Sequence, residues 1–329
     1  MSTRVTARGG SPAAGAPLGG GGRLPKVDPT SLRRQSPRYG ERVAMGVLGG
    51  AAMLSVLVTV GIVISLLLPA LSFFREVSVS EFLFGTRWTP RFAGQESYGV
   101  LPLVTGTLWT TVIALLIAVP FGLGAAVYLA EYAPPRVRKV LKPVLEVLAG
   151  IPSVVYGFFA LTFVAPVVLE GLLGIDVGTF SVLAAGLVLG IMIIPTVASL
   201  SEDAMSAVPS ALRQGSLALG ANKMRTTLRV VFPAAISGIA ASVVLGLSRA
   251  IGETMIVALA AGTQARMVGG PTEFGQTMTG FIAQTATGES TPGTLSYNTL
   301  FAVGLLLFLI TFVINMISIR LVRRFREAY

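Results

Sequence analysis

Arg249 and Glu253 are the two ionisable residues inside an otherwise uncharged apolar segment, residues 230–265. A charge near the centre of a bilayer costs about 2.5–3.5 kcal/mol, so both side chains are expected to face protein or water. On a continuous helix, a spacing of four residues places them on one face within ion-pair distance. The pair is therefore either a structural salt bridge or part of a path for an anion. In such a path the planar guanidinium of Arg249 would bind oxyanion oxygens, and Glu253 would orient it.

Four hydroxyl side chains are secondary candidates for the same path, because each lies near a proline, a glycine or a charged residue in an apolar segment. Hydroxyl groups in such segments also form hydrogen bonds between packed helices, and this alternative stays open for each of them. The four residues are Ser153, Tyr156, Thr196 and Thr254.

The composition leaves few other groups that could do chemistry. Hydrophobic residues make up 53% of the 329 residues and charged residues 12%, and the chain has neither Cys nor His. Thiol catalysis, disulfides and imidazole metal sites are therefore excluded. The sequence also lacks a Gly-rich phosphate-binding loop that ends in Lys and Ser or Thr. We therefore expect a non-enzymatic protein that has no cofactor and does not itself bind ATP.

Long uncharged segments predict an all-α, polytopic membrane protein with about six transmembrane helices. Spanning the hydrocarbon core takes about 20 helical residues, and each segment is longer than that. Residues 1–40 are rich in Gly, Pro, Ser and Arg and are expected to form a disordered cytoplasmic tail, with residues 41–329 as the transmembrane domain. The six segments are 43–74, 97–130, 147–169, 177–201, 230–265 and 290–319.

Basic residues predict the orientation of the chain in the membrane. If both termini are cytoplasmic, 20 of the 25 Lys and Arg residues fall on the cytoplasmic side. The opposite side then carries only Arg75, Arg87, Arg91 and Arg266. This asymmetry is typical of the positive-inside pattern.

Residues 201–233 connect two apolar segments, and their residue types are arranged more regularly than a simple linker requires. Leu217, Leu219 and Leu228 lie on either side of Gly220, and Pro233 precedes the next apolar segment. The pattern predicts two short helices with a glycine turn at the membrane surface. An amphipathic helix that only anchors the loop in the interface is the alternative.

This connection is similar to the coupling loop of ABC importer permeases, in which Glu-Ala-Ala is followed by three residues, Gly, nine residues and an apolar-x-apolar-Pro sequence. Gly220, Val230, Phe232 and Pro233 match at that spacing, whereas residues 214–216 replace Glu-Ala-Ala. The resemblance implies the ABC importer permease fold and a loop that docks on an ATPase subunit, where a glycine allows close backbone approach. The positions expected to take part in this coupling are Gln214, Gly215, Ser216, Ala218, Gly220, Val230 and Pro233.

Three further strings resemble the PstC family of phosphate-specific permeases: SRAIGETM at 248–255, FLFGTRWTP at 82–90 and LAGIPSVVYGFFAL at 148–161. The resemblance runs from about residue 43 to the C-terminus. It implies a permease subunit of an ATP-driven importer of inorganic phosphate in a bacterial cell membrane. The partners that it implies are a second, PstA-like permease, two PstB-like ATP-binding subunits, a PstS-like extracytoplasmic phosphate-binding protein and membrane lipid, but no nucleic acid.

Other functions remain as alternatives. The chain could be the sister permease PstA, although the Phe-Gly-Thr-Arg-Trp string and Met255 favour PstC. It could also be a permease for sulfate or molybdate, whose spans and coupling loop would look alike. A channel or an intramembrane enzyme is disfavoured, because neither a ring of like charges nor a nucleophile beside a base is visible.

Overall fold

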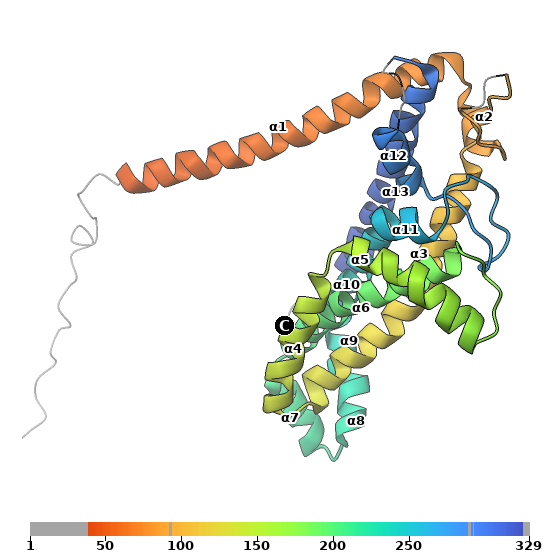
Figure 1. Ribbon diagram of the computed structural model, residues 1–329. Helices are drawn as coiled ribbons and strands as arrows, with labels where there is room; N and C mark the ends of the chain where they lie inside the picture. The colour runs from red at the N-terminus through yellow and green to blue at the C-terminus, as the bar shows by residue number, and fades with distance from the viewer. Residues whose placement is uncertain (1–38, 92–93, 289–290, 292, 325–329) are drawn as a thin grey trace, which may run out of the picture. The chain divides into compact units, whose positions relative to one another are not determined.

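The computed structural model describes residues 39–91, 94–288, 291 and 293–324 (Figure 1). Within these ranges the regular structure is helical, and Trp88 and Tyr98 form one isolated β-bridge. Most of the predicted tail lies outside the described residues, and its last two positions begin the first helix at Tyr39. The predicted all-α membrane fold is therefore confirmed.

Within the described ranges, five helices are long and apolar enough to cross a membrane. Their positions agree with five of the six predicted segments, and two of them continue beyond the α-helix as wider π-helical segments that end at Tyr132 and Leu172. Among the five, α6 is the most buried. They are α1 (Tyr39–Glu76), α3 (Leu101–Val127), α5 (Ser153–Phe159, extended by Ala160–Leu172), α6 (Val182–Ser206) and α13 (Leu295–Arg324).

The remaining predicted segment, residues 230–265, is broken. Helical residues Lys223–Ala234 meet α10 (Ile236–Gly252) at an angle of 71°, and α11 (Met255–Ala260) follows after a second break. The described residues therefore contain five candidate spans, or six if the bent pair counts as one span. The shorter helices are α2 (Val79–Phe84), α4 (Pro135–Ala149), α7 (Ser210–Ala218), α8 (Lys223–Thr226), α9 (Phe232–Ala234) and α12 (Met278–Thr287).

The described residues 39–58 and those from Thr59 onward belong to two separate units, and the second unit holds the predicted site. Its centre is the pair α3 and α6. A Cβ atom at Gly190 of α6 would lie 2.8 Å from the carbonyl oxygen of Ala114 on α3, so the two backbones approach too closely for a larger residue. Small residues let membrane helices gain close van der Waals contact in this way.

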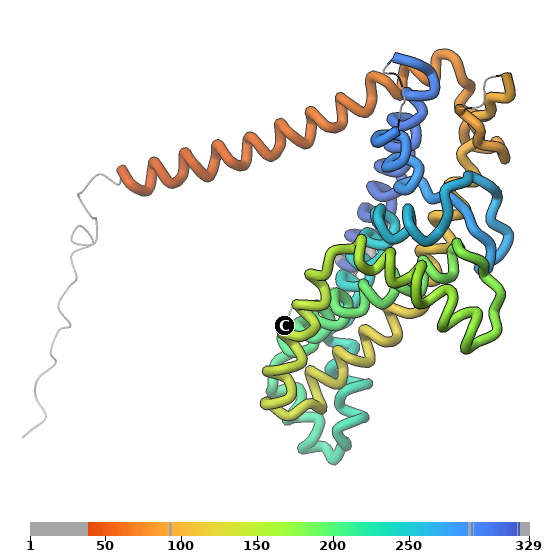
Figure 2. The backbone as a smooth tube through the Cα atoms, viewed as in Figure 1, coloured from red at the N-terminus to blue at the C-terminus, as the bar shows by residue number. Residues whose placement is uncertain are grey.

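The second unit has a distinct hydrophobic cluster at each end of this central pair. In Figures 1 and 2, α2 and α12 lie at one end of the unit, and α7 and α8 at the other. At the α2 end, the rings of Phe73, Phe82, Trp88 and Phe281 pack edge to face. At the α7 end, aliphatic side chains such as Met205 form the core. Separate hydrophobic clusters therefore position the charged groups at the two ends.

Candidate functional site

Arg249 lies in the last turn of α10 and is held by neutral groups. Its Nη1 donates to Oγ1 of Thr196 on α6 at 3.0 Å, and its Nη2 lies 3.5 Å from the carbonyl oxygen of Ala149 at the end of α4. Among the described residues, no carboxylate lies within ion-pair distance of Arg249. Neutral oxygens orient the guanidinium without neutralising it, so its charge remains available to an anion.

The predicted ion pair between Arg249 and Glu253 is wrong. Helix α10 ends at Gly252, and the backbone of Glu253 is extended, with φ −66° and ψ 133°. Oε1 of Glu253 accepts hydrogen bonds from the backbone N–H groups of Met255 and Ile256 at 3.0 and 3.3 Å. The four-residue rule requires a continuous helix, and here the carboxylate instead satisfies free N–H groups at the start of α11.

Two of the predicted hydroxyl residues gather near Arg249 at the end of α4. Thr196 accepts a hydrogen bond from Arg249, as described above, and Tyr156 of α5 donates its hydroxyl to the carbonyl oxygen of Leu148 at 3.1 Å. Because Leu148 and Ala149 are consecutive, Arg249 and Tyr156 contact the same turn of backbone. The structure thus brings residues from α5, α6 and α10 together around one helix end.

The other two hydroxyl residues are placed differently. Ser153 is half-buried and begins α5. Thr254 lies in the break after α10, where its hydroxyl donates to the carbonyl oxygen of Gly252 at 3.3 Å. In the same break, the carbonyl oxygen of Glu253 accepts a hydrogen bond of 2.6 Å from Oγ1 of Thr279 on α12. Thr254 and Glu253 therefore belong to a junction between α10, α11 and α12.

The predicted glycine turn in the coupling loop is confirmed. Helices α7 and α8 lie on either side of Gly220, whose φ is +82°. The hydroxyls of Ser216 and Thr226 lie 2.9 Å apart and join the two helices. A Cβ atom at Gly220 would meet no heavy atom within 4 Å, so the left-handed backbone, rather than lack of space in this chain, favours glycine there.

The outer face of α7 is solvent-exposed. Gln214, Gly215 and Ala218 are all exposed, and the adjoining Leu217 and Leu219 are 51% and 91% exposed. Apolar side chains this exposed at a loop tip are typical of a surface that another protein covers.

The last two predicted coupling residues lead from this loop into the membrane. Val230 lies in the π-helical segment Thr227–Val231, and Pro233 lies in α9, next to the bend before α10. They connect the exposed helix to the span that carries Arg249.

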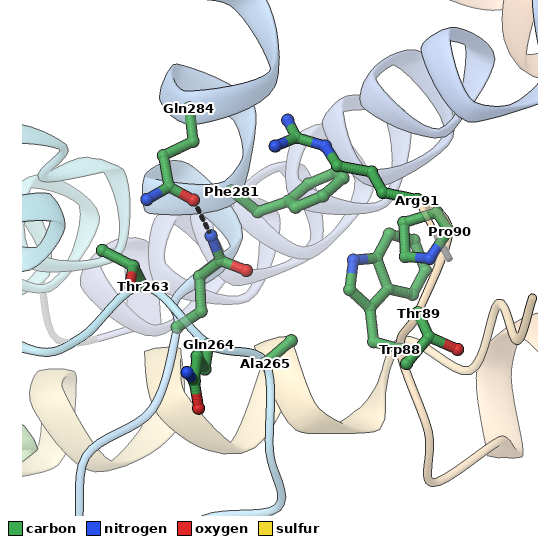
Figure 3. Close-up of a pocket in the computed structure, with 10 residues that line it drawn as sticks. Trp88, Thr89, Pro90, Arg91, Thr263, Gln264, Ala265, Phe281 and Gln284 are labelled. Atoms are coloured by element: carbon green, nitrogen blue, oxygen red, sulfur yellow. Dashed lines mark hydrogen bonds between the residues drawn. The ribbon is translucent and has the colours of Figure 1, made fainter. Parts of the chain in front are cut away.

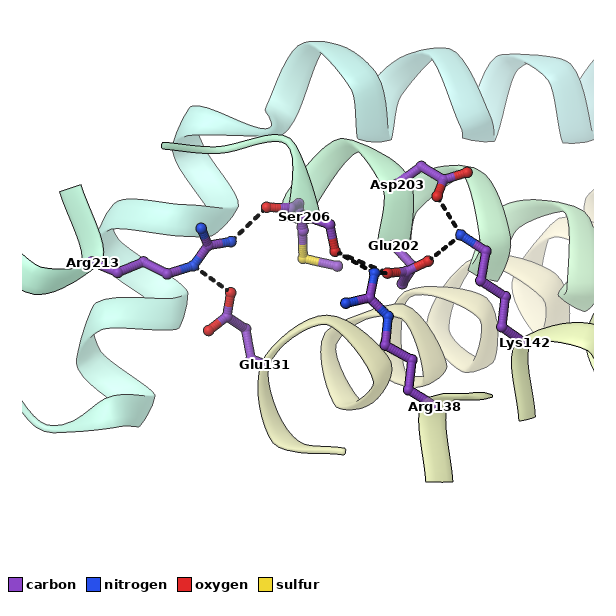
Figure 4. A network of polar contacts seen from close by, with 8 residues as sticks. Glu131, Arg138, Lys142, Glu202, Asp203, Ser206 and Arg213 are labelled. Carbon is purple, nitrogen blue, oxygen red and sulfur yellow. Dashed lines mark hydrogen bonds and ion pairs between the residues drawn. The ribbon is translucent and has the colours of Figure 1, made fainter. Parts of the chain in front are cut away.

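A buried carboxylate fastens α4 to α6, as Figure 4 shows. The side chain of Glu202 is 1% exposed and accepts hydrogen bonds from Arg138, from Nζ of Lys142 at 2.8 Å and from Oγ of Ser206 at 2.8 Å. Lys142 also contacts Asp203. Hydrogen bonds to Asp203 and Glu202 raise the pKa of Lys142, since both carboxylates favour its charged form. The buried charge is therefore compensated by two cations.

Arg213 fastens α7 to the same end of the protein (Figure 4). Its Nε donates to Oε1 of Glu131 at 3.0 Å. Its two terminal nitrogens donate to the carbonyl oxygens of Val208 and Met205 at 2.5 and 2.7 Å. One side chain thus joins the exposed helix to the ends of α3 and α6.

Our sequence predictions missed both clusters. The signal was present: Glu202 and Asp203 end an apolar segment, and four basic residues lie at 134–142, in another connection on the same predicted side. From the sequence those basic residues indicate only the orientation of the chain, because their partners are far away in the sequence.

Residues 118–327 match the family described as "Binding-protein-dependent transport system inner membrane component". The chain is 38% identical over 282 residues to a probable ABC transporter permease protein, YqgH, of Bacillus subtilis, covering 85% of this chain and 90% of the relative. It is 37% identical over 278 residues to the phosphate transport system permease protein PstC 1 of Mycobacterium tuberculosis, covering 74% and 82%. With PstC of Haemophilus influenzae it shares 33% identity over 296 residues, covering 84% and 91%.

Solved structures of ABC transporters share the fold. A chain of the bacterial alginate ABC transporter in complex with its pentasaccharide-bound periplasmic protein matches with a TM-score of 0.58 and 17% identity, covering 88% of this chain and 98% of that chain. A chain of the MetNI methionine ABC transporter in an inward-facing conformation matches with a TM-score of 0.52 and 20% identity, covering 68% and 96%.

Proposed function

The chain belongs to the family of inner membrane components of binding-protein-dependent transport systems, and we propose that it is a permease subunit of an ATP-driven importer of inorganic phosphate. The assignment of phosphate as the substrate rests on the similarity to PstC proteins at 33–37% identity over most of the chain. The chemistry of the site supports this substrate, because Arg249 is held by a hydroxyl and by no carboxylate among the described residues, and such a guanidinium suits an anion.

Transport energy comes from partner subunits in this proposal. The chain forms half of the translocation path together with a PstA-like permease, and two PstB-like subunits hydrolyse ATP. The exposed face of α7 supports docking of an ATPase there, with Leu217 and Leu219 covered in the complex. A PstS-like protein delivers phosphate on the outer side, and the chain itself performs no catalysis.

Both termini lie in the cytoplasm in this proposal, as the asymmetry of basic residues supports. Because the chain has no cysteine, single cysteines report on orientation without background. Arg87→Cys should react with an impermeant thiol reagent added to sealed cells, and Lys223→Cys should react only after lysis. Labelling of Lys223→Cys in intact cells would refute this orientation.

Substitutions of Arg249 test whether phosphate passes this residue. Arg249→Gln should lower ATP-driven phosphate uptake about a hundredfold at matched membrane levels, since a charge-assisted hydrogen bond contributes about 1.5–3 kcal/mol. Arg249→Lys should be poor as well, because an ammonium keeps the charge but loses the planar fork. Arg75→Gln, an exposed arginine at the end of α1, is the matched control and should leave uptake unchanged.

Two results would contradict the proposal. Normal phosphate uptake by an assembled Arg249→Gln complex would remove Arg249 from the path. Competition by sulfate or molybdate as strong as that by unlabelled phosphate in the wild-type complex would favour the other oxyanion permeases.

A further inference from the structure

A pocket of about 480 Å³ with both polar and apolar walls lies at the end of the protein opposite α7 and α8. Figure 3 shows its walls, which come from the loop after α2, the loop after α11 and helix α12. The predicted orientation places this end outside the cytoplasm. None of the residues that line the pocket is acidic, and Arg91 is the charged one among them.

Arg91 makes one side-chain hydrogen bond to the part of the chain that the structure describes. One terminal nitrogen donates to Oγ1 of Thr285 on α12 at 3.1 Å. Among the described residues, no carboxylate lies within ion-pair distance of it. A guanidinium has five N–H donors in a planar fork that matches pairs of oxyanion oxygens. Within the described part of the chain, a hydroxyl and no carboxylate orients this cation.

Trp88 adds a donor that has no partner. The residue is 5% exposed, and its Nε1 is buried without a hydrogen-bond acceptor among the described residues. Figure 3 shows the ring nitrogen turned toward the interior of the pocket. An unsatisfied buried N–H costs about 1–3 kcal/mol, so such a group commonly indicates a missing ligand or water.

Neutral amides complete the wall. Nε2 of Gln276 donates to Oε1 of Gln284 at 2.6 Å, so the amide nitrogen of Gln284 takes no part in this hydrogen bond. Gln264 is exposed at the rim. Phe281 provides an apolar side that packs edge to face against Trp88. With one cation, several N–H donors and no carboxylate, the pocket suits an oxyanion better than a cation or an apolar ligand.

The backbone holds the Arg91 loop in place. A Cβ atom at Gly85 would lie 2.5 Å from Cα of Gly99, so the two ends of the loop cross where only glycine fits. Helix α12 carries Gln284 and Phe281. The hydroxyl of Thr279, on the same helix, donates to the carbonyl oxygen of Glu253. The pocket therefore shares a wall with the junction that follows Arg249.

We propose that this pocket captures inorganic phosphate as it leaves the delivery protein, before it reaches Arg249. The inference rests on the proposed function and adds a first oxyanion site on its outer side. Arg91 supplies the charge and the indole N–H of Trp88 supplies a directed donor, and no carboxylate among the described lining residues repels the ion. An ion held there moves inward rather than returning to bulk solvent.

The test uses the complete transporter with its partners in proteoliposomes, at saturating phosphate-loaded binding protein, and measures phosphate taken up per ATP hydrolysed. Arg91→Gln should lower this ratio about fivefold, because a charge-assisted hydrogen bond is lost and released phosphate escapes. Trp88→Phe, which keeps the ring and removes the N–H, should lower it about twofold. The ATPase rate stimulated by the loaded binding protein should stay unchanged in both variants.

Two control variants separate the capture site from simpler roles. Arg87→Gln removes an exposed arginine of the same loop outside the pocket and should keep the wild-type ratio. Thr285→Val removes the hydrogen bond that orients Arg91 and should lower the ratio less than Arg91→Gln does, because the guanidinium itself stays in the pocket. A wild-type ratio in Arg91→Gln overturns the proposal, and so does an equal loss in Thr285→Val, which would indicate bracing of the loop. A parallel loss of ATPase stimulation would indicate that Arg91 docks the binding protein instead. A wild-type complex without phosphate uptake would defeat the proposed function rather than this inference.

Discussion

At the α7 end of the protein, Arg138 and Lys142 meet the buried carboxylate of Glu202, whereas at the opposite end Arg91 lies in a pocket with neutral partners among the described residues. Arg249, between them along the predicted path, resembles Arg91 in having a hydroxyl partner and no described carboxylate. Paired charges are satisfied and fix the relative positions of helices. Cations held only by neutral groups keep their field for a mobile anion.

Removing a charged side chain should have different energetic consequences at the two ends of the protein. Glu202 is fully buried, so removing its cations leaves an uncompensated charge in a poorly solvated position. Arg91 is exposed at the rim of its pocket, so removing it exchanges protein contacts for water. Substitutions should therefore affect stability at the first end and transport at the second.

The largest effect is expected from removing both cations of the network. Arg138→Gln combined with Lys142→Gln should lower stability by about 3–5 kcal/mol, because Glu202 then stays buried without a partner. The measurement is the thermal denaturation midpoint of the detergent-purified complex. Adding Glu202→Gln to this double variant should restore a large part of the loss, since the buried charge is then gone.

Asp203 provides the matched control for that experiment. It contacts the same lysine, but its side chain is 55% exposed. Asp203→Asn should change the midpoint little, because exposed ion pairs contribute about 0–1 kcal/mol. If the triple variant is no more stable than the double variant, the loss does not come from the buried charge, and the contrast between the two ends fails.

A smaller effect is expected when a carboxylate is introduced at the pocket, so that Arg91 faces an acidic group as the cations around Glu202 do. Gln264→Glu places a carboxylate at its rim and should lower phosphate uptake per ATP about fivefold, since a like charge about 4 Å away in water costs about 1 kcal/mol. The denaturation midpoint should not change. Gln95→Glu makes the same charge change on the neighbouring loop outside the pocket and should have no effect. Equal effects of the two substitutions would mean that the general surface charge, rather than the pocket, matters.

Local patterns predicted much of this architecture. Uncharged length identified the spans, and the spacing around Gly220 predicted two short helices and their turn. The same reasoning failed at Glu253, because it assumed that the helix carrying Arg249 continues. A glycine followed by a carboxylate that binds the next N–H groups ends the helix, and this competition is hard to judge from spacing alone.

The sequence by itself determined that the chain is a polytopic α-helical membrane protein, that residues 201–233 hold two short helices joined by a glycine turn, and that a single arginine stands within an apolar segment. Those properties depend on composition and on neighbours within one or two helical turns. Only the tertiary structure decided that Arg249 lies beside Thr196, that Glu202 is compensated from α4, and that Arg91 and Trp88 share a pocket with α12. These contacts join residues from 50 to almost 200 positions apart, and their partners are selected by helix packing, which no local spacing specifies.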